Sequence, residues 1–214
     1  MAIIYSRFWR ITNSALVSIK MTFQPTLIDN CWIFMPRRFE DSRGYFQETF
    51  KVSQIEQELG FTFEINQVNQ SRSAKGVLRG IHWADVPPGQ RKYVSVARGQ
   101  ILDFVVDLRV DSPTFKKWQM FNLSEANGHV LLIGNGIGHA FLSLEDETVV
   151  TYFCDQEYSP STERTLNPLD GNIGIPFEEI ALDQSLGEVC LSPKDQAGLD
   201  LMSLLEAGIL PKVL

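Results

Sequence analysis

Residues 92–108 decide the fold class, and they read KYVSVARGQILDFVVDL. Two β-prone segments, Tyr93–Ala97 and Ile101–Leu108, flank Arg98-Gly99-Gln100, a short break typical of a tight hairpin. Short strands separated by turns at this roughly ten-residue spacing predict a sandwich or small barrel rather than alternating strand–helix units. The spacing continues through four more β-prone segments: Trp118–Leu123, Val130–Ile133, Ala140–Leu144 and Thr148–Cys154.

The segments before this region predict a hairpin and one short helix. Short strands flank the turn Asp41–Gly44. A helix is predicted over Ser53–Leu59 and ends at Gly60. Ser53 would cap its N-terminus, with Glu56 in the capping-box position.

The remaining segments carry weaker signals. Phe61–Gln70 is predicted to be extended, and residues 69–80 to form a polar, glycine-punctuated loop. After Pro160 the pattern breaks into turns, and Ser203–Ala207 is predicted to be a terminal helix.

The composition indicates a globular domain. The chain has 214 residues, of which 44% are hydrophobic and 21% are charged, enough to bury a real core. Its net charge of −7 argues against broad nucleic-acid binding, which needs a basic surface. We expect residues 21–214 to form one domain. Residues 1–20 are predicted to be an extension, either disordered or upstream of the native start.

The cysteines indicate a reducing compartment. The chain has three cysteines, Cys31, Cys154 and Cys190, which is an odd number, and no two of them form a CxxC pair. Neither a disulfide framework nor a zinc knuckle is therefore indicated. We predict reduced thiols in a cytoplasmic protein. No apolar run reaches the roughly 18 residues that span a bilayer, so no membrane association is expected.

A histidine beside two cations indicates chemistry. His82 ends the stretch Gly76–His82, with Arg79 three residues before it and Lys92 on the next β-prone segment. An imidazole titrates near neutral pH, whereas the two cations can hold phosphate or an enolate oxygen. This set suggests proton abstraction from a carbon acid. On the residues alone, a structural histidine satisfied by backbone groups remains the alternative.

Several motifs then occur in a recognisable order. They are Asp41–Glu48 (D-x-R-G-x-F-x-E), Gln67–Asn69, Leu78–His82, Val106–Arg109 with Ser112–Phe115, Gly138–Phe141, Tyr152 with Tyr158–Pro160, and Leu191–Asp195. In these motifs the chain resembles the dTDP-4-dehydrorhamnose 3,5-epimerase family, from about Asp29 to the C-terminus. Several motifs in the correct order are far more specific than any one of them.

The resemblance implies a fold, a reaction and partners. The fold would be all-β, a cupin double-stranded β-helix (jelly roll) with a few short helices. The enzyme, an isomerase, would epimerise carbons 3 and 5 of dTDP-4-dehydro-6-deoxy-D-glucose to give dTDP-4-dehydro-L-rhamnose. It would need no cofactor and no metal. It would act as a homodimer whose subunits share strands.

The resemblance also implies four catalytic residues. His82 would be the base, with Asp195 fixing its tautomer. Lys92 would stabilise the enolate formed at the carbon-4 ketone, which serves both carbons. Tyr152 would deliver a proton to the opposite face, because inversion needs a second group. Without the resemblance, Asp195 is typical of a turn residue, Tyr152 of a packing residue and Lys92 of a solvated surface residue.

Further residues would bind the substrate. Arg43 and Arg79 would hold the diphosphate, since guanidinium groups bind phosphate oxygens bidentately. His139 would lie in the pocket near the sugar, whereas Arg91 is expected to be solvated. The residues predicted to contact the nucleotide or sugar are Glu48, Gln67 and Asn69.

The expectation of no metal also follows from spacing. Metal-binding cupins usually supply an H-x-H pair, but His82 is followed by Trp83 and Ala84. Only His82 and His139 remain as plausible ligands, which is too few imidazoles for such a site. Trp83 stands where the family commonly has Phe or Tyr, and it is expected to change the pocket volume modestly.

Three alternatives remain open at this stage. A 3-epimerase of a related dTDP-4-keto-deoxysugar could retain the same residues. A jelly roll that binds sugar nucleotides without catalysis would not require an acid–base set. A metal-dependent dioxygenase would need bound iron.

Overall fold

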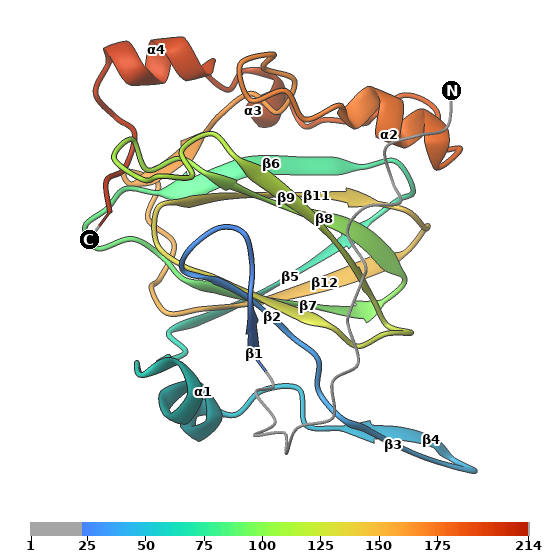
Figure 1. Cartoon of the computed structure of the whole chain (residues 1–214). Helices are drawn as coiled ribbons and strands as arrows, with labels where there is room; N and C mark the ends of the chain where they lie inside the picture. Colours follow the sequence, from blue (N-terminus) through green and yellow to red (C-terminus); the bar gives the residue numbers. More distant parts are fainter. Residues whose placement is uncertain (1–22, 214) are drawn as a thin grey trace, which may run out of the picture.

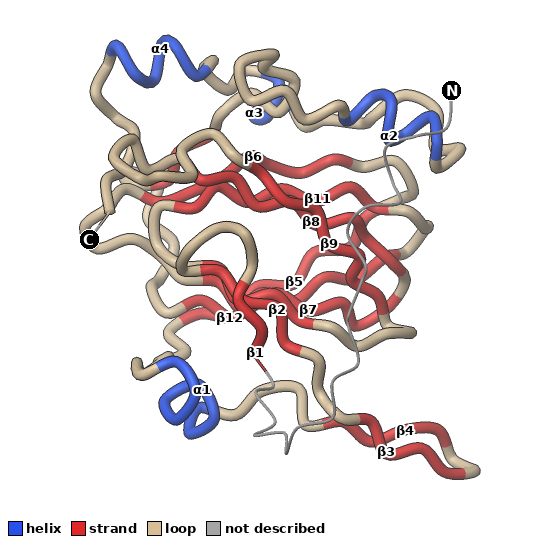
Figure 2. Tube along the Cα trace, viewed as in Figure 1, coloured by secondary structure: helices blue, strands red, loops and turns tan. Residues whose placement is uncertain are grey.

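A computed structural model describes residues 23–213 of the chain (Figure 1). The prediction for residues 1–20 therefore lies outside the described residues. The predominance of strands agrees with the all-β prediction: two antiparallel sheets face one another, and the helices lie at the periphery (Figure 2). None of the helices in the described part is long and apolar enough to cross a membrane.

The larger sheet has six strands in the order β1-β2-β10-β7-β12-β5. Every pairing within it is antiparallel, as expected for a sandwich or jelly roll. The strands are β1 (Phe23–Pro25), β2 (Cys31–Phe34), β10 (Val130–Ile133), β7 (Lys92–Arg98), β12 (Thr148–Cys154) and β5 (Gln67–Ser73).

The second sheet has five strands in the order β13-β6-β11-β8-β9. Above it lie the C-terminal helices, and below the larger sheet lies α1, Val52–Leu59 (Figure 1). The strands are β13 (Glu163–Thr165), β6 (Leu78–Ala84), β11 (Ile137–Ser143), β8 (Gln100–Asp107) and β9 (Trp118–Ser124), and the upper helices are α2 (Phe177–Asp183), α3 (Pro193–Gln196) and α4 (Leu201–Glu206).

Strand β8 explains why the hydrophobic residues form stacked layers. Alternate side chains of a strand face opposite sides of a sheet. Ile101 and Val105 accordingly belong to the core between the sheets. Leu102 and Phe104 belong to the core beneath the C-terminal helices. A third cluster packs α1 against the outer face of the larger sheet.

A two-stranded hairpin projects away from this body (Figure 1). It consists of β3 (Arg38–Asp41) and β4 (Gly44–Gln47), joined by the predicted turn at Asp41–Gly44. Phe46, on β4, is 70% exposed. The hairpin thus presents aromatic surface that its own chain does not bury.

The predicted hairpin around Gly99 is wrong. The strands β7 and β8 exist, but they lie in different sheets and do not pair. Gly99 has φ +79°, and a Cβ there would lie 2.5 Å from the Thr148 hydroxyl oxygen. This glycine therefore lets the chain turn tightly against the start of β12 while it changes sheets.

Two local predictions also need correction. The helix α1 begins at Val52 after Lys51, and no side chain caps it, whereas Gly60 does end it in the left-handed conformation. The Glu56 carboxylate accepts a hydrogen bond from Thr62 instead of closing a capping box. Residues 69–73 belong to β5 and residues 78–80 to β6, so the predicted loop shrinks to a short turn.

The C-terminal region contains more structure than turns alone. The terminal helix is α4, Leu201–Glu206, two residues earlier at its start than predicted. The strand β13 and the helices α2 and α3 were not predicted. They are short, and tertiary contacts rather than periodicity stabilise elements of this length.

Candidate active site

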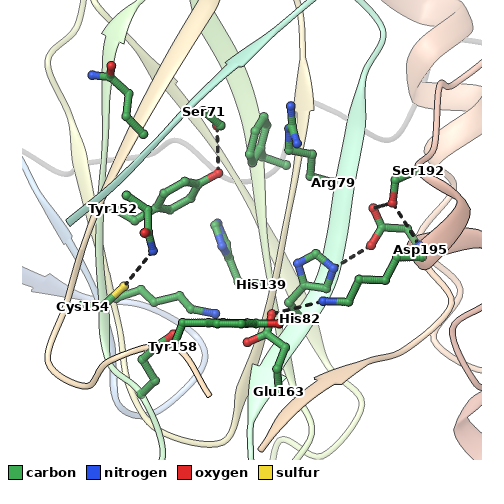
Figure 3. A pocket seen from close by; sticks show the side chains of 16 residues that line it. Ser71, Arg79, His82, His139, Tyr152, Cys154, Tyr158, Glu163, Ser192 and Asp195 are labelled. Carbon is green, nitrogen blue, oxygen red and sulfur yellow. Dashed lines mark hydrogen bonds and ion pairs between the residues drawn. The ribbon is translucent and has the colours of Figure 1, made fainter. Parts of the chain in front are cut away.

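A cavity of about 360 Å³ opens between the two sheets. The larger sheet supplies Asn69 from β5 and Tyr152 from β12, and the smaller sheet supplies His82 from β6 and His139 from β11. Helix α3 closes one side with Asp195 (Figure 3). Seven predicted site residues line this one cavity: Asn69, Arg79, His82, Lys92, His139, Tyr152 and Asp195.

His82 is held by a carboxylate. Its Nε2 lies 2.6 Å from Oδ1 of Asp195, whose side chain is 4% exposed, whereas 25% of the His82 side chain is exposed. Burial alone would raise the pKa of the Asp195 carboxyl. The hydrogen bond and charge of His82 outweigh burial and lower this pKa, with help from Ser192 and Lys194. A carboxylate that accepts from Nε2–H leaves Nδ1 of His82 free to accept a proton.

The backbone around His82 needs a glycine two residues earlier. Gly80 has φ +115°, and a Cβ there would lie 2.4 Å from the carbonyl oxygen of His139. Only a residue without a side chain allows β6 to approach β11 this closely. In the resulting register His82 and His139 are direct cross-strand partners. Both imidazoles therefore line the same cavity.

Tyr152 lies on the opposite sheet from His82. Its hydroxyl oxygen is 3.2 Å from Oγ of Ser71 on the neighbouring strand β5. Burial raises the pKa of the Tyr152 phenol, and the hydrogen bond with Ser71 opposes this only in part. The phenol is consequently protonated at neutral pH and can act as a proton donor.

A second histidine–carboxylate pair lies at the wall of the cavity. Nε2 of His139 is 2.8 Å from Oδ2 of Asp103, and both side chains are nearly inaccessible. Burial raises the pKa of Asp103, while the charge and hydrogen bond of His139 oppose the rise. The rings of His139 and Tyr152 meet edge to face, with centroids 6.1 Å apart. His139 thus packs directly against Tyr152.

Three cations line the cavity: Arg79, Lys92 and Lys194. Arg79 is held from behind, because its Nε donates to Oγ of Ser73 at 3.1 Å. Lys194 pairs with Glu163 at 3.6 Å. Such a group of cations in a chain of net charge −7 is a local anion-binding arrangement.

Three predicted substrate ligands do not line the cavity of a single chain. Arg43 lies on the projecting hairpin, 87% exposed, and pairs with Asp41. Glu48 follows that hairpin and pairs with Lys51 at 3.3 Å. Gln67 lies at the edge of the cavity: its side chain donates to Asn69 and accepts from the backbone N–H of Tyr158, and both of these residues line the cavity.

Sequence reasoning missed several residues of this site. Ser192 caps α3 and bonds to Asp195, and its position three residues before Asp195 is a capping signal that could have been found. Ser71 and Glu163 gave no comparable signal, because pairing between distant strands brings them to the cavity. Asp103 gave none either: it is buried behind His139, to which the pairing of β8 with β11 brings it. The remaining lining residues that were given no site role include Gln70, Gln90, Phe141, Cys154, Tyr158 and Lys194.

The structure changes the reading of two neighbours. Trp83 does not line the cavity: it is 1% exposed and packs in the core beneath the C-terminal helices. Alternation along β6 places it on the other face from His82. Arg91 is not a freely solvated residue, because its guanidinium pairs with Asp155 at 3.0 Å and lies 4.7 Å from the ring centre of Phe61.

The described residues contain no cluster of three or more His, Cys, Asp or Glu side chains that could hold a metal. The Nε2 atoms of His82 and His139 are each hydrogen-bonded to a separate carboxylate. Both imidazoles therefore already have a carboxylate partner at Nε2. The fold and site define a double-sheet β-protein in which a histidine–carboxylate pair, a tyrosine and a group of cations line one cavity.

Comparison with known proteins gives the family. Residues 25–203 match the family model described as dTDP-4-dehydrorhamnose 3,5-epimerase. The chain is 40% identical to the dTDP-4-dehydrorhamnose 3,5-epimerase of Mycolicibacterium smegmatis, over 89% of this chain and 91% of that protein. The chain therefore belongs to the dTDP-4-dehydrorhamnose 3,5-epimerase family, a family of isomerases.

Two solved structures are similar throughout. The rmlC epimerase of Mycobacterium tuberculosis superposes with a TM-score of 0.85 at 32% identity, covering 90% of this chain and 94% of that one. A 3'-monoepimerase from Streptomyces bikiniensis in complex with dTDP-quinovose superposes with a TM-score of 0.82 at 36% identity, covering 88% of this chain and 92% of that one. These likenesses confirm the cupin jelly roll that the motifs predicted.

Proposed function

We propose that this protein epimerises carbons 3 and 5 of dTDP-4-dehydro-6-deoxy-D-glucose to give dTDP-4-dehydro-L-rhamnose. One observation carries the proposal: a carboxylate-held histidine and a protonated tyrosine line a single cavity from opposite sheets. Inversion at a carbon needs a base on one face and a proton donor on the other. Membership of the epimerase family supports the same reaction.

The reaction begins with proton removal beside the ketone. Nδ1 of His82 takes the proton from carbon 3, and the electron pair moves onto the carbon-4 oxygen to give an enolate. Asp195 stabilises the imidazolium that forms, because its carboxylate is already hydrogen-bonded to Nε2. Lys92 donates to the enolate oxygen, a contribution of about 3 kcal/mol for a donor placed at a developing oxyanion.

The second half of the reaction returns a proton from the other face. The Tyr152 hydroxyl delivers its proton to carbon 3, and the enolate collapses to the ketone. Before carbon 5 reacts, His82 releases its proton to solvent and Tyr152 regains one from solvent. Carbon 5 also flanks the carbon-4 ketone, so the restored groups treat it in the same manner. Arg79 holds the diphosphate, while Asn69, Gln67 and His139 contact the nucleotide or sugar.

We further propose a homodimer in which subunits share strands. The hairpin β3–β4 leaves its own body, and its aromatic residues Phe39 and Phe46 are 49% and 70% exposed. Docked on a second copy, this hairpin would bring Arg43 and Glu48 of one subunit to the cavity of the other. Phe46→Asp should shift the mass measured by light scattering to that of a monomer and weaken dTDP binding.

The matched control for this change is Leu182→Asp, because Leu182 on α2 is 68% exposed and lies outside the hairpin. It should leave the mass and the affinity for dTDP unchanged. A dimer that survives Phe46→Asp would count against strand sharing.

The cysteines, all free and with Cys31 and Cys154 buried, are compatible with the proposed cytoplasmic location.

A second candidate is a 3-epimerase, because the Streptomyces bikiniensis relative is a 3'-monoepimerase. Incubation with dTDP-4-dehydro-6-deoxy-D-glucose in deuterated water, followed by NMR, separates the candidates. Deuterium at carbons 3 and 5 supports the double epimerase, and deuterium at carbon 3 alone supports the second candidate. Tight dTDP binding without any exchange would leave only a binding protein.

A further inference from the structure

A serine completes the hydrogen-bonded chain behind His82. Oγ of Ser192 donates to Oδ2 of Asp195 at 2.8 Å, and Oδ1 of the same carboxylate bonds to Nε2 of His82 at 2.6 Å (Figure 3). The serine oxygen also accepts from the backbone N–H of Asp195 at 3.1 Å. Ser192 therefore contacts Asp195 twice, once through the backbone and once through the carboxylate.

The backbone of this segment is fixed independently of the serine. Before α3, Cys190 forms a bridge with Val77, and its carbonyl accepts from the N–H of Leu78 at 2.9 Å. After α3, the carbonyl of Leu199 accepts from the N–H of Asn167 at 2.9 Å. These contacts tie the chain before α3 to the start of β6 and the chain after α3 to the segment that follows β13. What they leave free is the rotation of the Asp195 carboxylate about its own side-chain bonds.

The groups that face this carboxylate come from three elements. They are His82 on β6, Ser192 and Lys194 on the α3 segment, and Glu163 on β13, which pairs with Lys194. Lys194 acts on Asp195 through its charge, at a distance beyond a hydrogen bond. Among the described side chains, Ser192 is the neutral donor that bonds to the oxygen that His82 does not use.

We propose that Ser192 is a positioning residue for the base: its hydroxyl locks Oδ2 of Asp195, so that Oδ1 stays aligned with Nε2 of His82 and the carboxylate stays ionised. The inference rests on the proposed epimerase function and assigns a role to a residue that does not itself exchange a proton with the substrate. Without the hydroxyl, Asp195 can rotate and pick up a proton more readily. The imidazolium formed during turnover then loses part of its stabilisation.

The test uses three substitutions at one position. Ser192→Ala removes both the cap and the donor, and Ser192→Gly removes the donor but retains most of the capping preference. Ser192→Thr retains the hydroxyl. We expect kcat to fall about tenfold in the Ala and Gly variants, with KM within twofold of the wild type, because a hydrogen bond to a charged group is lost. The Thr variant should recover most of the activity.

The pH profile separates positioning from simple capping. The acid limb of the kcat profile should move to higher pH in Ser192→Ala and Ser192→Gly, because the Asp195 carboxylate loses a hydrogen bond and takes up a proton at higher pH. Asp200→Ala is the matched control, since Asp200 caps α4 by accepting from the N–H of Ser203 and does not line the cavity. It should lower the melting temperature without moving the pH profile.

Two outcomes would overturn the inference. One is a wild-type pH profile in a folded Ser192→Gly protein, and the other is a Thr variant as impaired as the Ala variant. Failure of the proposed function looks different, because the wild-type protein itself would then show no solvent exchange into the ketosugar. If the wild type is active, His82→Ala is inactive and Ser192→Gly is unaffected, only the role of Ser192 is rejected.

Discussion

Replacing Asp195 by Asn should lower kcat about a thousandfold while leaving dTDP affinity nearly unchanged. The carboxylate lies 2.6 Å from Nε2 of His82, and its side chain is 4% exposed. The attraction between the two charges exists only after His82 has taken the substrate proton. Asp195 therefore stabilises the transition state more than the ground state, and its loss should appear in kcat.

The magnitude follows from the geometry. With charge centres about 4 Å apart and an effective dielectric constant near 20, the pair is worth about 4 kcal/mol. At about 1.4 kcal/mol per factor of ten, this corresponds to roughly a thousandfold in rate. The amide of Asn can still accept from Nε2–H, so the His82 tautomer and the fold should survive.

The assay is steady-state turnover of the ketosugar, with dTDP binding measured by calorimetry on the same samples. Asp200→Asn is the control, since it makes the same acid-to-amide change on α4 and retains a capping side chain. It should retain wild-type kcat. An Asp195→Asn protein with kcat within threefold of the wild type would refute the assignment of His82 and Asp195 as a working pair.

Three further predictions concern anion binding and the core. Lys92→Ala should lower kcat about a hundredfold, because a donor to the enolate is lost, and steady-state kinetics will measure it. Arg79→Ala and Arg43→Ala should each weaken dTDP binding about tenfold in calorimetry, with little effect on the melting temperature. Asp107→Asn should reduce the free energy of unfolding by about 3 kcal/mol, because it leaves the buried Arg109 uncompensated. Burial favours a raised pKa for Asp107, but hydrogen bonds, the largest from Arg109, lower this pKa. The contribution of Asp107 to the free energy of unfolding is therefore full above about pH 4 and declines as the pH falls through the pKa of Asp107 in the folded protein. Urea melts at several pH values will measure this decline.

The strands were predictable where their environment is simple. β10 and β12 have the predicted bounds, because short apolar segments bounded by turn residues identify buried strands well. The pairing partners were not predictable in the same way. The chain around Gly99 has the composition of a hairpin, yet its two strands enter different sheets. A turn signal reports a reversal of the chain and does not report which strands then pair.

The helix cap shows a different limit. Ser53 and Glu56 have the spacing of a capping box, but the helix starts one residue before Ser53 and leaves both side chains out of a cap. α1 packs through Ile55 into the aromatic cluster below the larger sheet. That packing sets where the helix begins, and it outweighs a capping preference of about 1 kcal/mol.

The site was predictable to the extent that motifs carry it. The family motifs led to His82, Tyr152 and Asp195, and the structure brings all three to one cavity. The partners Ser71 and Asp103 come from strands distant in sequence, and no local pattern marks them. Burial and cross-strand register determine which polar side chains meet, and both depend on the complete fold.

The most direct test of a two-sided proton transfer is hydrogen exchange in a variant without the phenol. In deuterated water, Tyr152→Phe should return substrate that carries deuterium at carbon 3 with its original configuration. The His82 side chain is 25% exposed, so its proton can exchange with solvent, and the imidazole can return a deuteron to the same face of carbon 3. His82→Ala should give no exchange. Inversion at a normal rate in Tyr152→Phe, or exchange that persists without His82, would contradict the account.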